Sequence, residues 1–437
     1  MLALALMLGG GGSPSPLPEL ALQLLAVLIL LTWLTLPSCR DQWRRIPTPA
    51  RLIAGILVAL PLLQLIPLPP ALWQALPGRE LQREALALVD LDQTWRPISL
   101  APQRTLASFL SLLPPLLMLC MAATLGRGGR IRLIWVVLLV GLASLLLGTL
   151  QLTAGEASPS HLYGDVRAVL TGFQANRNTT ADFMLIAMLA VPVLVRLLAE
   201  RGHVPANHLV VLGMAGGGMA LFALATVLTA SRMGIALLPV PLLIGLWLLR
   251  GWLPLGRKAV LGTLAALPIT VLLALLAARS NPTLAAVAER FAFVRELRPE
   301  LWRDALVVVR EHFPAGVGMG NFVPALLTHE RLEVVRPFMP NRAHNDYLEL
   351  LAEAGIAGIA AICAASWLIL REGWRALRDP ARSSSGLALF AIGALTVFAL
   401  HSVVDYPLRS MSMACLGAVC AALLMTPRVA TGSGDVE

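Results

Sequence analysis

The chain has 437 residues, of which 57% are hydrophobic and only 14% are charged, and its mean hydropathy is +0.76. A soluble protein of this length could not bury so much apolar surface, so the composition predicts an all-α polytopic membrane protein. The net charge of +9 suits the basic loops that orient membrane proteins. We expect no nucleic-acid partner, because no basic face with interleaved aromatic residues is present.

Apolar segments that can cross about 30 Å of hydrocarbon need roughly 20 helical residues. Eleven are predicted in chain order, at about 20–37, 51–67, 105–124, 132–153, 182–199, 208–229, 233–249, 259–278, 347–370, 387–404 and 409–426. The opening residues 1–8 are apolar but too short to span, and they lack a basic leader. We expect them to be the end of a helix that begins upstream, which would give twelve spans.

The connecting loops alternate in character. Short arginine-rich loops are expected in the cytoplasm by the positive-inside rule, at 38–50, 125–131, 200–207, 250–258 and 371–386. The opposite set is expected outside, at 68–104, 154–181, 230–232, 279–346 and 405–408. The predicted division is therefore N-terminal transmembrane helices over 1–278, a large helical periplasmic loop over 279–346, C-terminal transmembrane helices over 347–426 and a disordered cytoplasmic tail over 427–437.

The large loop has its own pattern. Apolar spacing predicts a helix over 300–312. Three glycines then alternate within 316–322. A phosphate-binding loop is one interpretation of them, but no strand precedes the glycines and no Lys-Ser/Thr pair follows. A tight turn that packs against a helix is favoured.

The segment 341–355 crowds titratable groups at the start of an apolar helix, where desolvation makes them costly and therefore indicative of function. His344 stands just before a helix N-terminus that attracts anions, beside carboxylates able to orient its ring. This placement predicts a general base; a capping or buried neutral imidazole is the alternative. Glu349 and Glu353 are four residues apart on one helix face, which is unfavourable unless a cation or water lies opposite.

Further polar clusters map to the same outer side: 172–181, the turn 229–234, the arginines around Trp302, and His401 with Asp405. Cationic and acid/base groups on one side of a membrane suit a lipid-phosphate substrate. Each cluster has a structural alternative. Arg232 could be a topological anchor that reaches lipid head groups, and Arg298 a solvated loop residue. Asn176 and Asn178 could cap the helix that begins near Thr179, which is favoured over binding.

Metal binding is weakly indicated. One Asp-x-Asp pair occurs in the first outer loop, at Asp90 and Asp92, and solvated loop charges are the favoured interpretation. We expect no metal site and no cofactor. Departing pyrophosphate can be neutralised by Mg²⁺ or by fixed cations, and arginine suits the second route because it is permanently charged and bonds phosphate oxygens in pairs.

Together these segments resemble a known family. The run 343–358 looks like the signature of the O-antigen ligase and polymerase superfamily of bacterial membrane glycosyltransferases. Supporting matches occur in family order at 176–178, 229–232, 298–302, 314–322 and 401–405. The resemblance covers about 172–408, and the first 150 residues agree only in hydropathy.

The resemblance implies a GT-C-type helical fold in the bacterial inner membrane and a metal-independent, inverting transfer. The donor would be a glycan on undecaprenyl pyrophosphate, and the acceptor a lipid or glycan hydroxyl. His344 would be the base, Asp405 would orient it, and Arg232 and Arg298 would bind pyrophosphate, with Arg295 able to replace Arg298. The implied substrate-binding residues are Arg177, Asn178, Arg295, Asn345 and Tyr347.

Two alternatives stay open at the sequence level. A polysaccharide repeat-unit polymerase of the same superfamily differs from a ligase chiefly in its acceptor. A polytopic transporter or lipid flippase would also explain the many spans. Transporters, however, tend to place charged sites near the bilayer midplane, whereas here the polar groups gather at one face.

Overall fold

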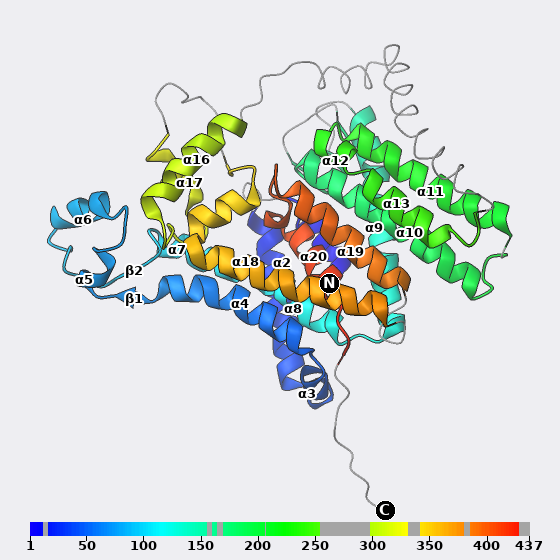
Figure 1. Cartoon of the computed structure of the whole chain (residues 1–437), viewed down its shortest axis with the longest axis horizontal. Helices are drawn as coiled ribbons and strands as arrows, with labels where there is room; N and C mark the ends of the chain where they lie inside the picture. Colours follow the sequence, from blue (N-terminus) through cyan, green and yellow to red (C-terminus); the bar gives the residue numbers. More distant parts are fainter. Residues whose placement is uncertain are drawn as a thin grey trace, which may run out of the picture.

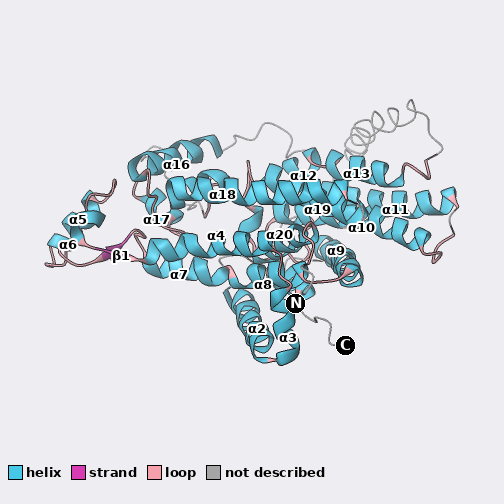
Figure 2. Ribbon diagram, turned by 60° about the horizontal axis from the view of Figure 1, so that its bottom comes forward, coloured by secondary structure: helices cyan, strands magenta, loops and turns pink. Residues whose placement is uncertain are grey.

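The computed structural model describes residues 1–11, 16–154, 160–163, 169–205, 207–253, 298–330, 341–379 and 385–427. These residues are largely helical (Figures 1 and 2). The elements are α1 (Leu2–Leu8), α2 (Pro16–Thr35), α3 (Pro37–Arg44), α4 (Thr48–Leu65), β1 (Pro67–Leu68), α5 (Pro70–Trp73), α6 (Glu80–Ala87), β2 (Arg96–Pro97), α7 (Pro102–Ser111), α8 (Leu113–Ala123), α9 (Arg127–Thr153), α10 (Arg177–Glu200), α11 (His208–Leu228), α12 (Arg232–Ala236), α13 (Pro239–Leu249), α16 (Arg298–His312), α17 (Phe322–Leu327), α18 (Asp346–Arg378), α19 (Ser385–His401), η3 (Pro407–Arg409) and α20 (Met411–Leu423).

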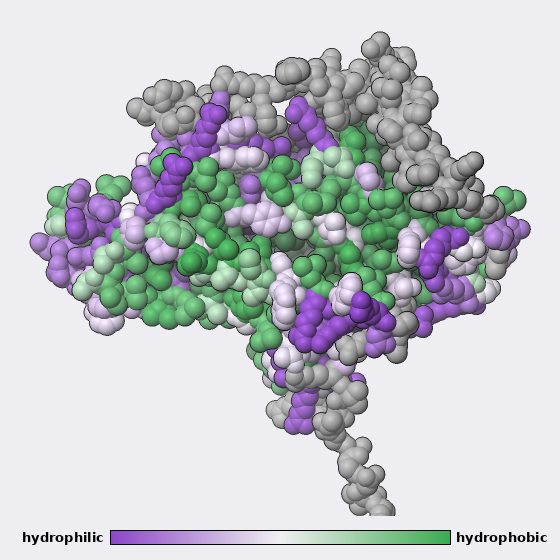
Figure 3. Space-filling view, in the orientation of Figure 1, coloured by the Kyte–Doolittle hydropathy of each residue, from purple (hydrophilic) through white to green (hydrophobic). Residues whose placement is uncertain are grey.

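Within the described ranges, eight helical stretches are long and apolar enough to cross a membrane. Eight of the eleven predicted spans coincide with them, two more appear as the shorter apolar helices α19 and α20, and the predicted span 259–278 lies outside the described residues. The predicted all-α polytopic membrane fold is confirmed. In Figure 3 the hydrophobic surface fills the middle of the molecule, with hydrophilic residues gathered at opposite margins.

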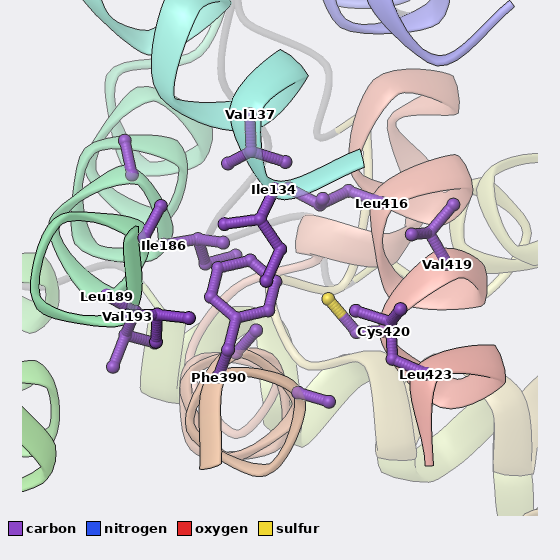
Figure 4. Packing of buried hydrophobic residues seen from close by; sticks show 14 of the residues in the cluster. Ile134, Val137, Ile186, Leu189, Val193, Phe390, Leu416, Val419, Cys420 and Leu423 are labelled. Carbon is purple, nitrogen blue, oxygen red and sulfur yellow. The ribbon is translucent and has the colours of Figure 1, made fainter. Parts of the chain in front are cut away.

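Helix α10 is the centre of the bundle. Its most apolar window is 89% buried, and it packs against α9, α11, α13 and α19. Figure 4 shows the packing of α9, α10, α19 and α20 around side chains such as Ile134, Ile186, Phe390 and Leu416. Peripheral spans differ: only 17% of the corresponding window of α2 is buried, as expected for a helix whose apolar surface faces lipid.

The opening residues fold into the seven-residue helix α1, which packs against α20 and α9. Two backbone hydrogen bonds follow it, from Ser412 N to Gly9 O at 3.1 Å and from Ala175 N to Gly10 O at 2.9 Å. They tie the N-terminal segment to the start of α20 and to the residues just before α10. The segment therefore helps to fix the end of the bundle at which α10 begins.

The segment between α4 and α7 forms a side lobe (Figure 1). Strands β1 and β2 close it as an antiparallel pair, with Pro67 opposite Pro97 and Leu68 opposite Arg96. The lobe carries α5 and α6. It connects to the large loop through the backbone bond from Leu100 N to Val317 O, at 3.0 Å.

A sharp kink divides α18. Gly355 has φ 52° and ψ −139°, a conformation that is open essentially to glycine alone. An added Cβ would lie 1.9 Å from the carbonyl oxygen of Pro314, and the next amide, Ile356 N, donates to that same oxygen at 3.0 Å. The kink lets the first turns of α18 pack against the large loop while the rest of the helix joins the bundle.

Candidate active site

His344 is held in the short loop before α18. Trp302 Nε1 of α16 donates to the Ala343 carbonyl at 2.9 Å, and Ala343 N donates to Glu349 Oε2 at 2.9 Å. Asn345 caps α18 by accepting from Leu348 N at 2.9 Å. Fixed on both sides, His344 adopts φ 50°, a left-handed conformation that costs energy for a residue other than glycine and clusters at functional sites.

Asp405 is the partner of His344. Its Oδ1 lies 3.1 Å from His344 Nδ1, and its Oδ2 accepts a hydrogen bond from the Asn178 side chain. Burial opposes ionisation of Asp405, but the hydrogen bond and charge of His344 outweigh it and hold the pKa of the carboxyl below its ordinary value. An ionised carboxylate accepts the Nδ1 proton, so Nε2 is left to take a proton from a substrate.

A third ring completes this part of the site. The rings of His344 and Tyr406 meet edge to face, with centroids 5.0 Å apart. Burial and the neighbouring charge of Asp405 raise the pKa of Tyr406, so its phenol stays protonated at neutral pH. Its hydroxyl accepts a hydrogen bond from Asn341 Nδ2 at 3.3 Å.

The first turns of α18 carry buried acids that share one cation. Arg409 contacts Glu353 at 3.0 Å, Asp346 at 3.3 Å and Glu349 at 3.5 Å. Burial lowers the pKa of Arg409, but the three carboxylates more than offset this and raise it. The requirement for a cation opposite Glu349 and Glu353 is thereby confirmed. Arg342 adds a second cation, 2.9 Å from Glu349.

The glycine-rich segment before α17 packs on this network. Glu353 Oε1 accepts from Gly320 N at 2.9 Å and from Phe322 N at 3.4 Å. A Cβ at Gly316 would lie 2.6 Å from the Glu353 carbonyl oxygen. The favoured prediction, a tight turn packed against a helix, is confirmed. The backbone amides of the turn donate hydrogen bonds to the carboxylate of Glu353.

The structure also locates two of the predicted arginines. Arg232 is the first residue of α12, and the packing of that helix on α10 is close enough that a Cβ at Gly234 would lie 2.5 Å from the Ala181 Cβ. Arg298 is the first residue of α16, and its charge acts on the imidazole of His401. Both arginines therefore lie at the end of the bundle where α10 begins, on the side of His344.

The remaining predicted site residues differ in their surroundings. Arg177 begins α10, and its Nη1 is buried without a hydrogen-bond partner among the residues that the structure describes. Asn176 caps α10, as predicted, whereas Asn178 reaches Asp405. The half-exposed Tyr347 donates its hydroxyl to the Ala399 carbonyl at 2.8 Å. Arg295 lies outside the described residues.

Two important groups were not predicted. Asp182 bonds His401 at 2.6 Å in the interior, and Arg409 gathers the acids of α18. Asp182 follows Asn178 by four residues, and His401 precedes Asp405 by four residues. Asn178 and Asp405 also contact each other. The sequence shows the four-residue spacing in each segment, but which residues meet between the two segments depends on the tertiary structure, as does the position of Arg409.

A metal site would need several acidic, histidine or cysteine side chains close together. Among the described residues, no three His, Cys, Asp or Glu side chains are grouped so that they could hold a metal ion. Asp92 accepts hydrogen bonds from Gln74 through its carbonyl and from Gln93 through its carboxylate, each at 2.7–2.8 Å. Both contacts belong to the side lobe between α4 and α7.

The part of the chain that contains His344 and the two arginines is similar to a known protein family. Residues 217–363 match the family model described as O-antigen ligase. This part of the chain is similar to the O-antigen ligase family. The match contains Arg232, Arg298 and His344, and it confirms the predicted resemblance to the ligase and polymerase superfamily. A search of curated proteins found no match. The chain is thus a multi-pass bacterial membrane protein with a glycosyltransferase-like ligase or polymerase domain.

Proposed function

We propose that the protein is a metal-independent, inverting glycosyltransferase of the ligase type in the bacterial inner membrane. It moves a glycan from undecaprenyl pyrophosphate to an acceptor hydroxyl, such as that of lipid A-core, on the periplasmic side. The hydrogen bond between His344 and Asp405 carries the proposal. It pairs a base with an orienting acid at the end of the bundle that also holds Arg232 and Arg298.

In the proposed reaction the acceptor oxygen attacks the anomeric carbon from the side opposite the pyrophosphate. The bond between that carbon and the phosphate oxygen breaks, and the pyrophosphate leaves with the electron pair. The acceptor proton passes to Nε2 of His344. Asp405 stabilises the imidazolium that forms and holds the imidazole ring in the required orientation, as the acid of a catalytic triad does.

The arginines supply the charge that the leaving group requires. Arg232 and Arg298 bind the pyrophosphate through paired guanidinium hydrogen bonds and stabilise its departure. Arg295 is the proposed substitute for Arg298. Arg177 joins them because its buried Nη1 has an unused donor, which a phosphate or sugar oxygen would satisfy. Fixed cations thereby take the role that Mg²⁺ has in other pyrophosphate-releasing enzymes.

Three polar residues support this arrangement. Asn178 contacts Asp405, Asn345 caps α18, and Tyr347 anchors the first turn of α18 on α19. We propose that they shape the substrate-binding surface around His344. A half-exposed Tyr347 ring is well suited to stack against a sugar of the donor or acceptor.

The direct test uses purified protein in proteoliposomes with a synthetic carrier-linked oligosaccharide, EDTA and no ATP. Lipid A-core and carrier-linked repeat units are offered in parallel as acceptors. Glycan transfer supports the proposal, and the acceptor used separates a ligase from a polymerase. Translocation of the carrier without any transfer would instead support a transporter and contradict the proposal.

A further inference from the structure

Helices α10 and α19 meet through two layers of polar side chains. Asn178 and Asp182 are four residues apart on α10, and His401 and Asp405 are four residues apart at the end of α19 and the turn that follows. The first layer joins Asn178 to Asp405. The second joins Asp182 Oδ1 to His401 Nδ1 at 2.6 Å.

The second layer is deeply buried, with Asp182 0% and His401 1% exposed. A nitrogen–oxygen distance of 2.6 Å is at the short limit of charge-assisted hydrogen bonds. Moreover, Oδ2 of Asp182 and Nε2 of His401 are both buried without a protein hydrogen-bond partner. Apolar residues would stabilise the contact between these helices at least as well, so packing alone does not account for the pair.

Resting on the proposed function, we propose that Asp182 and His401 form a buried charged pair that positions Asp405 and tunes the proton affinity of His344. Both are positioning residues, because they act through Asp405. The charged or titratable groups around this array are His344 from the loop before α18, Tyr406 from the turn after α19, Asp182 from α10 and Arg298 from α16. Asn178 adds a neutral donor.

The charge of His401 has a definite effect on this array. Asp405 interacts with the imidazoles of both His344 and His401. A positive charge on His401 offsets part of the negative charge of Asp405, so Asp405 stabilises the protonated form of His344 less strongly. His344 therefore releases the proton readily after each turnover. Replacing His401 by a neutral residue removes that positive charge, so the potential at Asp405 becomes more negative and His344 holds its proton more tightly.

The test compares His401→Gln with the double variant His401→Gln/Asp182→Asn, in which two neutral amides can still bond. The acid limb of the kcat/KM profile reports deprotonation of the base in the free enzyme. His401→Gln should move this limb to higher pH by about one unit, the lower end of the effect of a neighbouring charge, and the double variant, which also removes the opposing charge of Asp182, should move it in the same direction by less. His312→Gln, a change at another buried histidine, should leave it in place.

A second measurement needs no turnover. The rate at which diethyl pyrocarbonate modifies the partly exposed His344, followed by mass spectrometry across pH, should shift in the same direction in both variants. Unshifted profiles in both variants would overturn the inference while leaving the proposed function intact. If the wild-type protein transfers no glycan, the proposed function fails, and the modification profile still reports whether the pair controls His344.

Discussion

Arg409 Nη1 lies 3.0 Å from Glu353 Oε2, where η3 meets the first turns of α18. The same guanidinium contacts Asp346, whose backbone N–H donates to the carbonyl of Asp405 at 3.2 Å. Arg409 thus joins the helix that follows His344 to the turn that carries Asp405. The two halves of the proposed catalytic pair depend on one buried ionic network.

Replacing Arg409 should disrupt this ionic network and lower the stability of the protein. Arg409→Met removes a cation from the fully buried Glu349 and Glu353 and from the partly buried Asp346, and loss of one partner from a buried ionic group typically costs about 3–5 kcal/mol. Thermal unfolding in detergent measures the effect. Arg375→Gln, which breaks a more exposed pair with Glu372, is the control and should cost less than about 1 kcal/mol. Equal stability of Arg409→Met and wild type would refute the role of Arg409.

Asp405→Asn should leave the fold intact and slow transfer. The amide keeps the shape of the side chain but lacks the negative charge that stabilises the imidazolium. When its oxygen accepts from Asn178, its NH2 group faces Nδ1 of His344 and disfavours the Nδ1–H tautomer. A loss of about 10²–10⁴ in kcat is expected, by analogy with the acid of a catalytic triad. The measurement is the steady-state transfer rate, with unfolding temperature as the control. Wild-type kcat in this variant would show that Asp405 does not orient the base.

Lysine substitutions separate binding from anchoring at the arginines. Arg232→Lys and Arg298→Lys keep the charge but lose the paired hydrogen bonds to phosphate, so kcat/KM should fall roughly 10- to 100-fold, about 1.4–2.8 kcal/mol of transition-state stabilisation. If Arg232 is only a topological anchor at lipid head groups, lysine should serve equally well. Full activity of Arg232→Lys would therefore favour the anchor.

The kink of α18 predicts a strong glycine requirement. Gly355→Ala places a Cβ 1.9 Å from the Pro314 oxygen and forces alanine into a conformation it avoids, so stability should fall by more than 2 kcal/mol or so. Gly213→Ala, in an open stretch of α11, is the matched control and should be neutral or stabilising by up to about 1 kcal/mol. Unfolding in detergent should show a loss of stability for Gly355→Ala and no loss for Gly213→Ala.

His312 predicts a pH dependence of stability. Burial, reinforced by the charge of Arg79, lowers the pKa of His312 to about 4. The unfolded chain therefore takes up a proton at a higher pH, near 6.5, and stability that is complete above that value is lost as pH falls toward 4. His312→Gln should flatten this part of the profile. An unchanged slope between pH 6.5 and 4 in the variant would exclude His312 as its cause.

Hydropathy was sufficient to predict most of the spans, because any helix in contact with lipid must carry a long apolar run. The polar cluster around His344 was also predicted, since His344 and the acids after it break such a run. The contacts of Arg409 and Asp182 were not predicted, because a single charged residue in an apolar segment gives no indication of which residue it contacts. Their contacts depend on how η3 and α10 approach α18 and α19, which is tertiary structure and not local pattern.

Transfer by His344→Gln in the presence of EDTA tests the central claim most directly. Glutamine can keep a hydrogen bond at this position but cannot accept the acceptor proton at neutral pH, so release of undecaprenyl pyrophosphate and formation of product should both fall by about 10²–10⁴, while His312→Gln retains wild-type rates. Product formed by His344→Gln at the wild-type rate would contradict the account.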